Sequence, residues 1–138
     1  MHLDHVGLSV GDLEAQAAWY QEVLGLSASI RIDVAAAGLR IAFVQSEEGV
    51  AIELLERAGS VHPPSPETLG DAVLTQGFGH ICLRVDDVEA MYARILAAGG
   101  RGVLAPSPAP EPGVTMCYTA DPEGNLIELL DRPRPVGG

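Results

Sequence analysis

Two segments of this chain repeat each other, and each repeat carries one histidine and one glutamate. The segment His5–Glu14 reappears as His80–Glu89, and the segment Ile52–Glu56 reappears as Ile127–Asp131. Both pairs of segments are 75 positions apart, which is the distance from residue 5 to residue 80. A duplicated half that keeps these residues in register can bring two imidazoles and two carboxylates together about a pseudo-twofold axis. Such nitrogen and oxygen ligands suit a divalent metal ion.

Alternating apolar residues and turn signals predict the same order of elements in each half. In the first half, a strand precedes a helix that is capped by Asp12 and closed by Gly25, and three strands follow. The fold class is therefore predicted to be α+β, with two tandem βαβββ modules and helices on the outer faces. The expected strands are 2–10, 27–33, 39–45, 50–56, 80–85, 102–104, 114–119 and 125–130, and the expected helices are 13–24, 88–98 and a short one near 66–73.

Changes in composition along the chain predict the boundaries of these modules within a single domain, residues 1–138. Module one spans about 2–57, a linker rich in Pro and Ser spans about 58–76, and module two spans about 77–131. The Pro- and Gly-rich tail 132–138 is expected to be flexible. The Pro-rich stretch 106–113 is expected to be an extended loop between two strands.

The charge and the cysteine content restrict the partners and the compartment. The formal net charge of −11 disfavours binding to nucleic acid or to an anionic membrane surface. No apolar run has the length needed to span a bilayer, and the N-terminus does not resemble a signal peptide. The two cysteines do not make a disulfide framework, so we expect a reducing, cytoplasmic environment.

The two glutamates are the most informative of the repeated residues. Glu53 and Glu128 each lie inside an aliphatic strand, where an unpaired carboxylate carries a large desolvation cost. Each therefore needs a cation, and the alternative to a metal ion is an ion pair with Arg40, Arg57 or Arg84. A histidine at a strand start is usually an ordinary surface residue. The metal is favoured because all four groups share one repeat register.

Several motifs together resemble the vicinal oxygen chelate superfamily. This superfamily includes glyoxalase I, methylmalonyl-CoA epimerase, extradiol dioxygenases, fosfomycin-resistance enzymes and bleomycin-binding proteins. The resemblance covers the chain from His5 to about Leu130, and it implies paired βαβββ sheets around a metal cavity, often in a homodimer. The motifs are the strand-and-cap segments at His5 and His80, Trp19-Tyr20 ahead of Leu24-Gly25-Leu26, and the ending Asp121–Glu128.

The resemblance implies a set of four metal ligands: His5, Glu53, His80 and Glu128. The glyoxalase and epimerase branches use all four positions, whereas the dioxygenases and fosfomycin enzymes use three, so the presence of Glu53 favours the first group. The implied cofactor is one divalent ion (Ni, Co, Zn, Mn or Fe), with no organic cofactor.

The chain also departs from each branch of the family. Ser9 stands where glutathione-using glyoxalases usually carry Arg, and Arg57 stands where they carry Asn, so another thiol or a thiol-free substrate is possible. Ala36 stands where the epimerase has its second catalytic Glu. Tyr118 matches the dioxygenase signature, but the His expected shortly before it is missing. The predicted substrate pocket comprises Ser9, Arg57, Cys82, Arg84 and Tyr118.

These residues predict a metal-dependent lyase or isomerase that acts on a small α-hydroxycarbonyl or thiol-adduct substrate. The metal polarises the carbonyl, and a carboxylate moves a proton through an enediolate, with Glu128 as the first candidate for the base and Glu53 as the second. Two alternatives remain open. One is an Fe(II) extradiol-type dioxygenase that uses His5, His80 and Glu128 with Tyr118, and the other is a small-molecule binding or resistance protein without catalysis.

Overall fold

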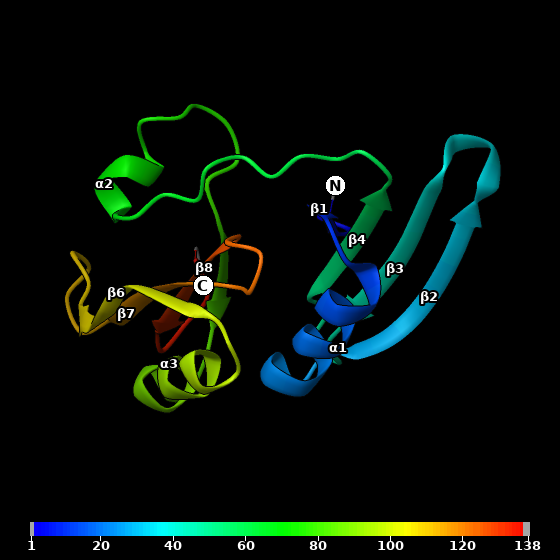
Figure 1. Cartoon of the computed structure of the whole chain (residues 1–138). Coiled ribbons are helices and arrows are strands. Elements are labelled where there is room, and N and C mark those ends of the chain that lie inside the picture. The colour runs from blue at the N-terminus through cyan, green and yellow to red at the C-terminus, as the bar shows by residue number, and fades with distance from the viewer. Residues whose placement is uncertain (1, 137–138) are drawn as a thin grey trace. The chain divides into compact units, whose positions relative to one another are not determined.

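Each half of the chain folds around its own four-stranded mixed sheet, with one long helix packed against it (Figure 1). The computed structural model describes residues 2–136 of the 138 in the sequence. One compact unit ends at Pro63, and a second unit begins at Pro64. The predicted α+β class with two tandem βαβββ modules is confirmed.

In unit 1, the strand order in the sheet is β1-β4-β3-β2. Strands β1 and β4 run parallel, whereas β3 is antiparallel to both of its neighbours. Helix α1 packs against β2, β3 and β4. The elements are β1 Val6–Val10, α1 Leu13–Leu24, β2 Ser27–Val34, the 3-10 turn η1 Ala35–Ala37, β3 Leu39–Gln45 and β4 Ala51–Arg57.

Unit 2 repeats this topology with the order β5-β8-β7-β6, in which β5 and β8 are parallel. Helix α3 packs against β6, β7 and β8. The helix expected near residues 66–73 is a single turn. The elements are α2 Leu69–Ala72, β5 Ile81–Arg84, α3 Val88–Ala97, β6 Arg101–Pro108, β7 Thr115–Ala120 and β8 Leu126–Asp131.

Local sequence signals determine where α1 begins and ends. The Asp12 side chain accepts a hydrogen bond from the backbone N–H of Ala15 at 3.0 Å, which satisfies one of the free donors of the first turn. At the other end, Gly25 adopts a φ of 71°, a conformation that glycine enters without a Cβ clash. The inner face buries Leu13, Ala17 and Tyr20, and each large apolar side chain buried in this way contributes roughly 1.5–3 kcal/mol.

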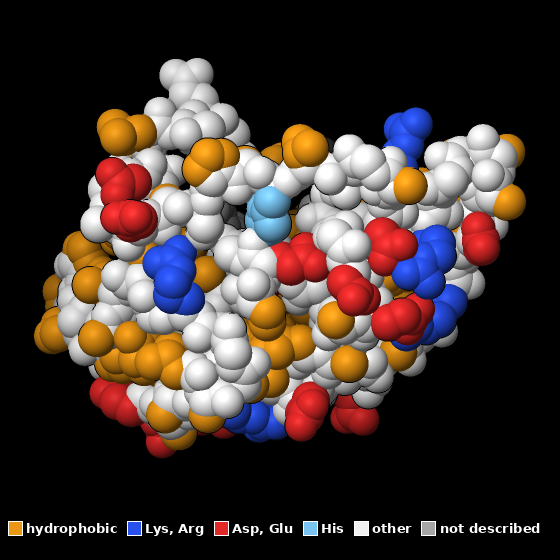
Figure 2. Space-filling model, viewed as in Figure 1, with side chains coloured by type: hydrophobic (Ala, Val, Ile, Leu, Met, Phe, Trp, Pro, Cys, Tyr) orange, Lys and Arg blue, Asp and Glu red, His pale blue; other side chains and the backbone are white. Residues whose placement is uncertain are grey.

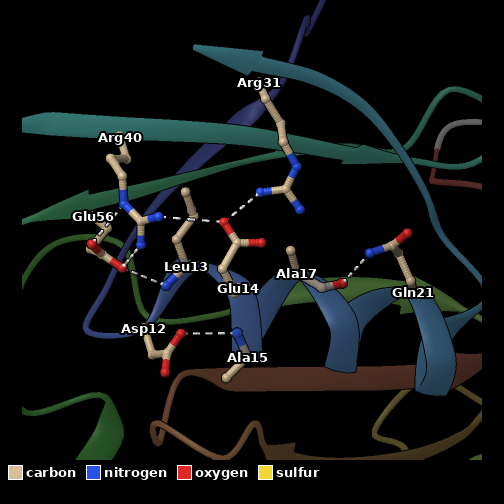
Figure 3. A network of polar contacts seen from close by, with 9 residues as sticks. All are labelled: Asp12, Leu13, Glu14, Ala15, Ala17, Gln21, Arg31, Arg40 and Glu56. Carbon is tan, nitrogen blue, oxygen red and sulfur yellow. Dashed lines mark hydrogen bonds and ion pairs between the residues drawn. The ribbon is translucent and has the colours of Figure 1, made fainter. Parts of the chain in front are cut away.

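An ion-pair network ties the start of α1 to its sheet (Figure 3). Glu56 at the end of β4 accepts hydrogen bonds from the backbone N–H of Leu13 at 2.8 Å and from the guanidinium of Arg40 at 2.8 and 3.0 Å. Glu14 on α1 bonds Arg31 of β2 at 2.9 Å. Acidic and basic side chains accordingly lie next to each other at the right of Figure 2, over the elements of unit 1.

A close approach of backbone holds the end of α3. A Cβ placed on Gly100 would lie 2.5 Å from the Ile95 side chain and 2.8 Å from the carbonyl oxygen of Ala120 on β7. Only glycine therefore allows the chain leaving α3 to pass this close to β7.

The expectation that residues 106–113 form a loop is wrong for its first part. Strand β6 continues to Pro108, with Ser107 opposite Met116 and Pro108 opposite Thr115. Proline is tolerated here because β6 is the edge strand of its sheet, where one side of the backbone needs no N–H donor. Of the tail expected to be flexible, residues 137 and 138 lie outside the described part of the chain.

Between residues 2 and 136, no helix combines the length and the apolar character that crossing a lipid bilayer requires.

Candidate functional site

In unit 1, the parallel pairing of β1 and β4 brings a histidine next to a glutamate. Gly7 of β1 lies opposite Glu53 of β4, and His5 precedes Gly7 by two residues, so its side chain is on the same face of the sheet. The Nε2 atom of His5 is 3.4 Å from Oε2 of Glu53, whose side chain is only 19% exposed. An imidazole nitrogen and a carboxylate oxygen thus lie side by side.

Asp4 orients the ring of this histidine. Its Oδ1 atom is 2.7 Å from Nδ1 of His5, which leaves Nε2 on the side of Glu53. The hydrogen bond to Asp4 is the largest effect raising the pKa of His5; burial opposes it, and the charge of Glu53 adds to it. A carboxylate behind a ligating histidine is a common device at metal sites. Asp4 was not predicted from the sequence, although its position next to His5 was a usable signal.

Unit 2 contains the corresponding pair at a shorter distance. Nε2 of His80 is 3.1 Å from Oε2 of Glu128, whose side chain is 14% exposed. Cys82 of β5 and Tyr118 of β7 lie directly opposite Glu128 on its two sides. The carboxylate of Glu128 thus has a thiol and a phenol as its neighbours in the sheet.

An aromatic ring supports the histidine in both units. Phe43 contacts His5 edge-on, with ring centroids 5.2 Å apart and planes at 84°. Tyr118 contacts His80 in the same way, at 5.2 Å and 79°. Phe43 and Tyr118 occupy equivalent positions in the repeat, since each lies opposite the glutamate of its own sheet.

The alternative partners considered for the two glutamates are engaged elsewhere or do not reach them. Arg40 binds Glu56 and Glu14 on the other side of its sheet. Within the described residues 2–136, no arginine forms an ion pair with Glu53 or Glu128. Over the same residues, no group of three or more His, Cys, Asp or Glu side chains is arranged so that it could hold a metal ion by itself. Each unit supplies two candidate ligands, and the joining of the two pairs around one ion stays a prediction.

The predicted pocket residues divide between the two units. In unit 1, Ser9 of β1 and Arg57 at the end of β4 are exposed. In unit 2, Cys82 and Arg84 of β5 are exposed, whereas Tyr118 is only 7% exposed.

Arg132 is a further candidate functional residue that was not predicted from the sequence. It stands 75 positions after Arg57, so the repeat register was the signal that identified it. Its guanidinium forms an ion pair with Glu111, from the loop between β6 and β7, while its buried Nε atom has no hydrogen-bond partner. The charge of Arg132 also reaches Cys82, where it opposes the increase in the pKa of the thiol.

Comparison with known proteins identifies the family. The sequence profile of the Glyoxalase/Bleomycin resistance protein/Dioxygenase superfamily matches residues 2–129. The chain belongs to this superfamily. This confirms the resemblance drawn from the two histidine segments and the ending at Glu128.

Similar proteins carry glyoxalase names. The chain is 31% identical over 133 residues to a Synechocystis protein named "Probable lactoylglutathione lyase", covering 94% of this chain and 95% of that one. It is 30% identical over 132 residues to the lactoylglutathione lyase of Neisseria meningitidis, covering 96% and 91%.

Among solved structures, the fold matches glyoxalase I from Zea mays with a TM-score of 0.77 and 25% identity. The match covers 96% of this chain but 45% of the maize chain, so this chain spans less than half the length of that enzyme. The trypanothione-dependent glyoxalase I of Leishmania major matches with a TM-score of 0.70 and 25% identity, covering 95% of this chain and 86% of that one.

Proposed function

We propose that this protein is a metal-dependent lyase or isomerase of the glyoxalase type. Its substrate is a small α-hydroxycarbonyl or thiol adduct with two neighbouring oxygen atoms. The observation that carries the proposal is the His–Glu pair that recurs in both units, with Nε2 to Oε2 distances of 3.4 and 3.1 Å. The lactoylglutathione lyase names of relatives at about 30% identity support the lyase class.

The donor atoms in the two units fit a divalent ion. His5 and Glu53 would supply one half of the ligand set, and His80 and Glu128 would supply the other. Two imidazoles and two carboxylates are ligands that Ni, Co, Zn, Mn and Fe accept. The glutamate side chains are mostly buried, and no arginine in residues 2–136 forms an ion pair with either of them, so a bound cation would lower their desolvation cost.

The bound ion would supply Lewis acidity that polarises the substrate carbonyl and makes the adjacent C–H more acidic. In our proposal, an Oε atom of Glu128 accepts that proton and returns it to the neighbouring carbon, with Glu53 as the second candidate. His80 orients Glu128 through their 3.1 Å contact. Ser9 and Arg57, both exposed in unit 1, are proposed to take part in selecting the thiol portion of the substrate.

The test is an activity screen on chelator-stripped protein that is reloaded with each of the five ions. A 2-oxoaldehyde is supplied with glutathione, with trypanothione or without thiol, and the loss of substrate is followed. We expect turnover that requires the added ion and disappears again with chelator. Turnover that survives complete metal removal would contradict the proposal. The same samples report the mass of the particle by light scattering, for which we expect a homodimer.

A second candidate is favoured by one specific contact. Tyr118, which matches the dioxygenase signature, lies against His80 and opposite Glu128. An Fe(II) dioxygenase using His5, His80 and Glu128 predicts oxygen uptake with a catechol substrate only when Fe(II) is present. An oxygen electrode measurement decides between the two, because the lyase consumes no oxygen.

A further inference from the structure

Glu128 is flanked on both sides by side chains that can donate a hydrogen bond. Strand β8 lies between β5 and β7 in the sheet. Cys82 on β5 and Tyr118 on β7 are each in direct register with Glu128, so all three side chains share one face. This placement follows from the strand pairing and does not depend on how the two units are arranged.

Both neighbours carry a hydrogen that a carboxylate can accept. Tyr118 carries a hydroxyl, and burial together with the neighbouring carboxylate of Glu128 raises the pKa of Tyr118 above its usual range. Although Cys82 is exposed as a residue, desolvation of its thiol is the largest cause that raises its pKa to about 12.

The equivalent positions in unit 1 contain no such donors. Gly7 and Phe43 lie in direct register with Glu53, and neither has a side-chain hydrogen-bond donor. Phe43 nevertheless keeps the edge-on contact with its histidine at the same 5.2 Å centroid distance. The edge-on contact with the imidazole therefore does not require a hydroxyl on the ring. The hydroxyl of Tyr118 is an addition that lies beside Glu128 in unit 2 only.

We propose that Cys82 and Tyr118 are positioning residues that fix the carboxylate of Glu128 and make the two acidic groups of the site functionally different. A carboxylate has about four lone-pair directions, and two of them are taken by the thiol and the phenol. The remaining directions include the one toward Nε2 of His80, at 3.1 Å. This inference rests on the proposed function only in assigning that direction to a metal ion.

The donor pair also explains why Glu128, rather than Glu53, is the better candidate for the base. A carboxylate that turns toward the substrate loses part of its compensating interactions, which is costly in a side chain that is only 14% exposed. In our proposal, the thiol of Cys82 and the hydroxyl of Tyr118 offset part of this cost for Glu128. Within residues 2–136, the polar contact of the Glu53 carboxylate is with His5 alone.

The first test uses metal-free protein in which glutamate side chains are labelled with ¹³C. The carboxylate resonance of Glu128 is assigned by its loss in Glu128→Gln. We expect Tyr118→Phe and Cys82→Gly each to shift this resonance, because each variant replaces a donor with the residue found at the equivalent position of unit 1, Phe43 or Gly7. Cys82→Ser retains a donor and is expected to restore most of the original shift. Tyr92→Phe, which removes a hydroxyl elsewhere in unit 2, is the control and leaves it unchanged.

The second test measures Co(II) affinity by chelator competition on the same variants. Loss of one partner behind a metal ligand typically weakens binding about 10- to 100-fold, and we expect Tyr118→Phe and Cys82→Gly to reach the lower end of this range. The wild-type Co(II) spectrum is expected to lack a sulfur-to-cobalt charge-transfer band, because Cys82 is a donor and not a ligand. Phe43→Tyr, which adds the hydroxyl at the equivalent position of unit 1, should not weaken Co(II) binding.

The two tests separate the inference from the function. If neither Tyr118→Phe nor Cys82→Gly moves the Glu128 resonance, the positioning role is wrong, whatever the metal affinity. A charge-transfer band would overturn the donor role of Cys82. If the resonance responds as expected but the wild-type protein binds no metal, the positioning role stands and the proposed function fails.

Discussion

The two halves of the chain keep the same histidine and glutamate but support them in different ways. In unit 1 an acidic neighbour, Asp4, holds the imidazole of His5 from behind. In unit 2 the corresponding position is Gly79, and the support falls instead on Glu128, through its two strand neighbours. The duplication therefore preserved the candidate ligands while their surroundings diverged. One half fixes its nitrogen donor and the other fixes its oxygen donor.

The helices are attached differently as well. Glu56 links the first turn of α1 to Arg40 through charged hydrogen bonds. The equivalent of Glu56 in unit 2 is Asp131, which is exposed, and the equivalent of Arg40 is Thr115. The α3 side relies on close packing at Gly100. An ionic contact at the start of α1 and a close steric fit at the end of α3 thus contribute to the stability of the two units.

The largest expected effect is on turnover, and it tests whether the two glutamates are different. Glu128→Gln should lower kcat by about 10²- to 10⁴-fold, the usual contribution of a general base, while most of the metal is retained. Glu53→Gln should lower kcat less. Steady-state kinetics with matched metal loading measures both. Equal losses in kcat would remove the functional difference between the halves.

The next largest effect is expected on the free energy of unfolding. It is measured for two glycines, Gly25 and Gly100, that occupy equivalent positions in the repeat. Gly100→Ala should lower the free energy of unfolding by about 1–3 kcal/mol, because its Cβ would collide with the backbone carbonyl of Ala120. Gly25→Ala meets no neighbouring atom and should cost about 1–2 kcal/mol, through its left-handed φ alone. Urea denaturation of both variants measures the difference. A larger loss for Gly25→Ala would argue against the steric account.

A smaller effect tests the support behind His5. Asp4→Asn should weaken metal binding about 10-fold, the lower end of what is typical for a partner behind a ligand. It should also lower the pKa of His5, since Asp4 is the main cause of its increase. Chelator competition and NMR titration of the metal-free protein measure the two effects. Glu48→Gln, an exposed change in the same unit, is the control. If Asp4→Asn behaves like this control, Asp4 has no orienting role.

The smallest effect concerns Glu56, whose pKa is lowered by the hydrogen bond from Arg40 and by that from Leu13. A lowered carboxyl pKa stabilises the fold above the ordinary value of 4.5, and this contribution is lost as the pH falls through the folded value. Glu56→Gln should therefore cost about 1 kcal/mol at neutral pH, allowing for solvent screening, and less below pH 4.5. Urea denaturation across pH measures it. Asp131→Asn should change little, and a pH-independent loss for Glu56→Gln would contradict the ionic contact.

The elements predicted well were those specified by neighbouring residues. The bounds of α1 follow from Asp12 at one end and Gly25 at the other, and both act within one turn of the helix. Strand β6 was predicted too short, because the tolerance of Pro106 and Pro108 depends on the edge position of the strand, which is a property of the whole sheet.

In the candidate site, too, the features visible in the sequence were predicted, and those that depend on the pairing of distant strands were not. The repeat register pointed to each His–Glu pair, because a period of 75 residues is visible in the sequence. The donors on Glu128 were not predicted as such, since Cys82 and Tyr118 are 36 residues apart and meet only through the pairing of three strands. Asp4 was overlooked for a different reason. It looks like an ordinary exposed acid until its oxygen is found 2.7 Å from His5.

The most direct test of the account is the metal content of the protein as isolated and of its histidine variants, measured by elemental analysis. We predict one divalent ion per chain in the wild type, and its loss in both His5→Ala and His80→Ala. His62→Ala, a change at an exposed histidine outside the repeat, should keep the ion. Two ions per chain, or a full ion retained after either His5→Ala or His80→Ala, would contradict the claim that both halves bind one shared cation.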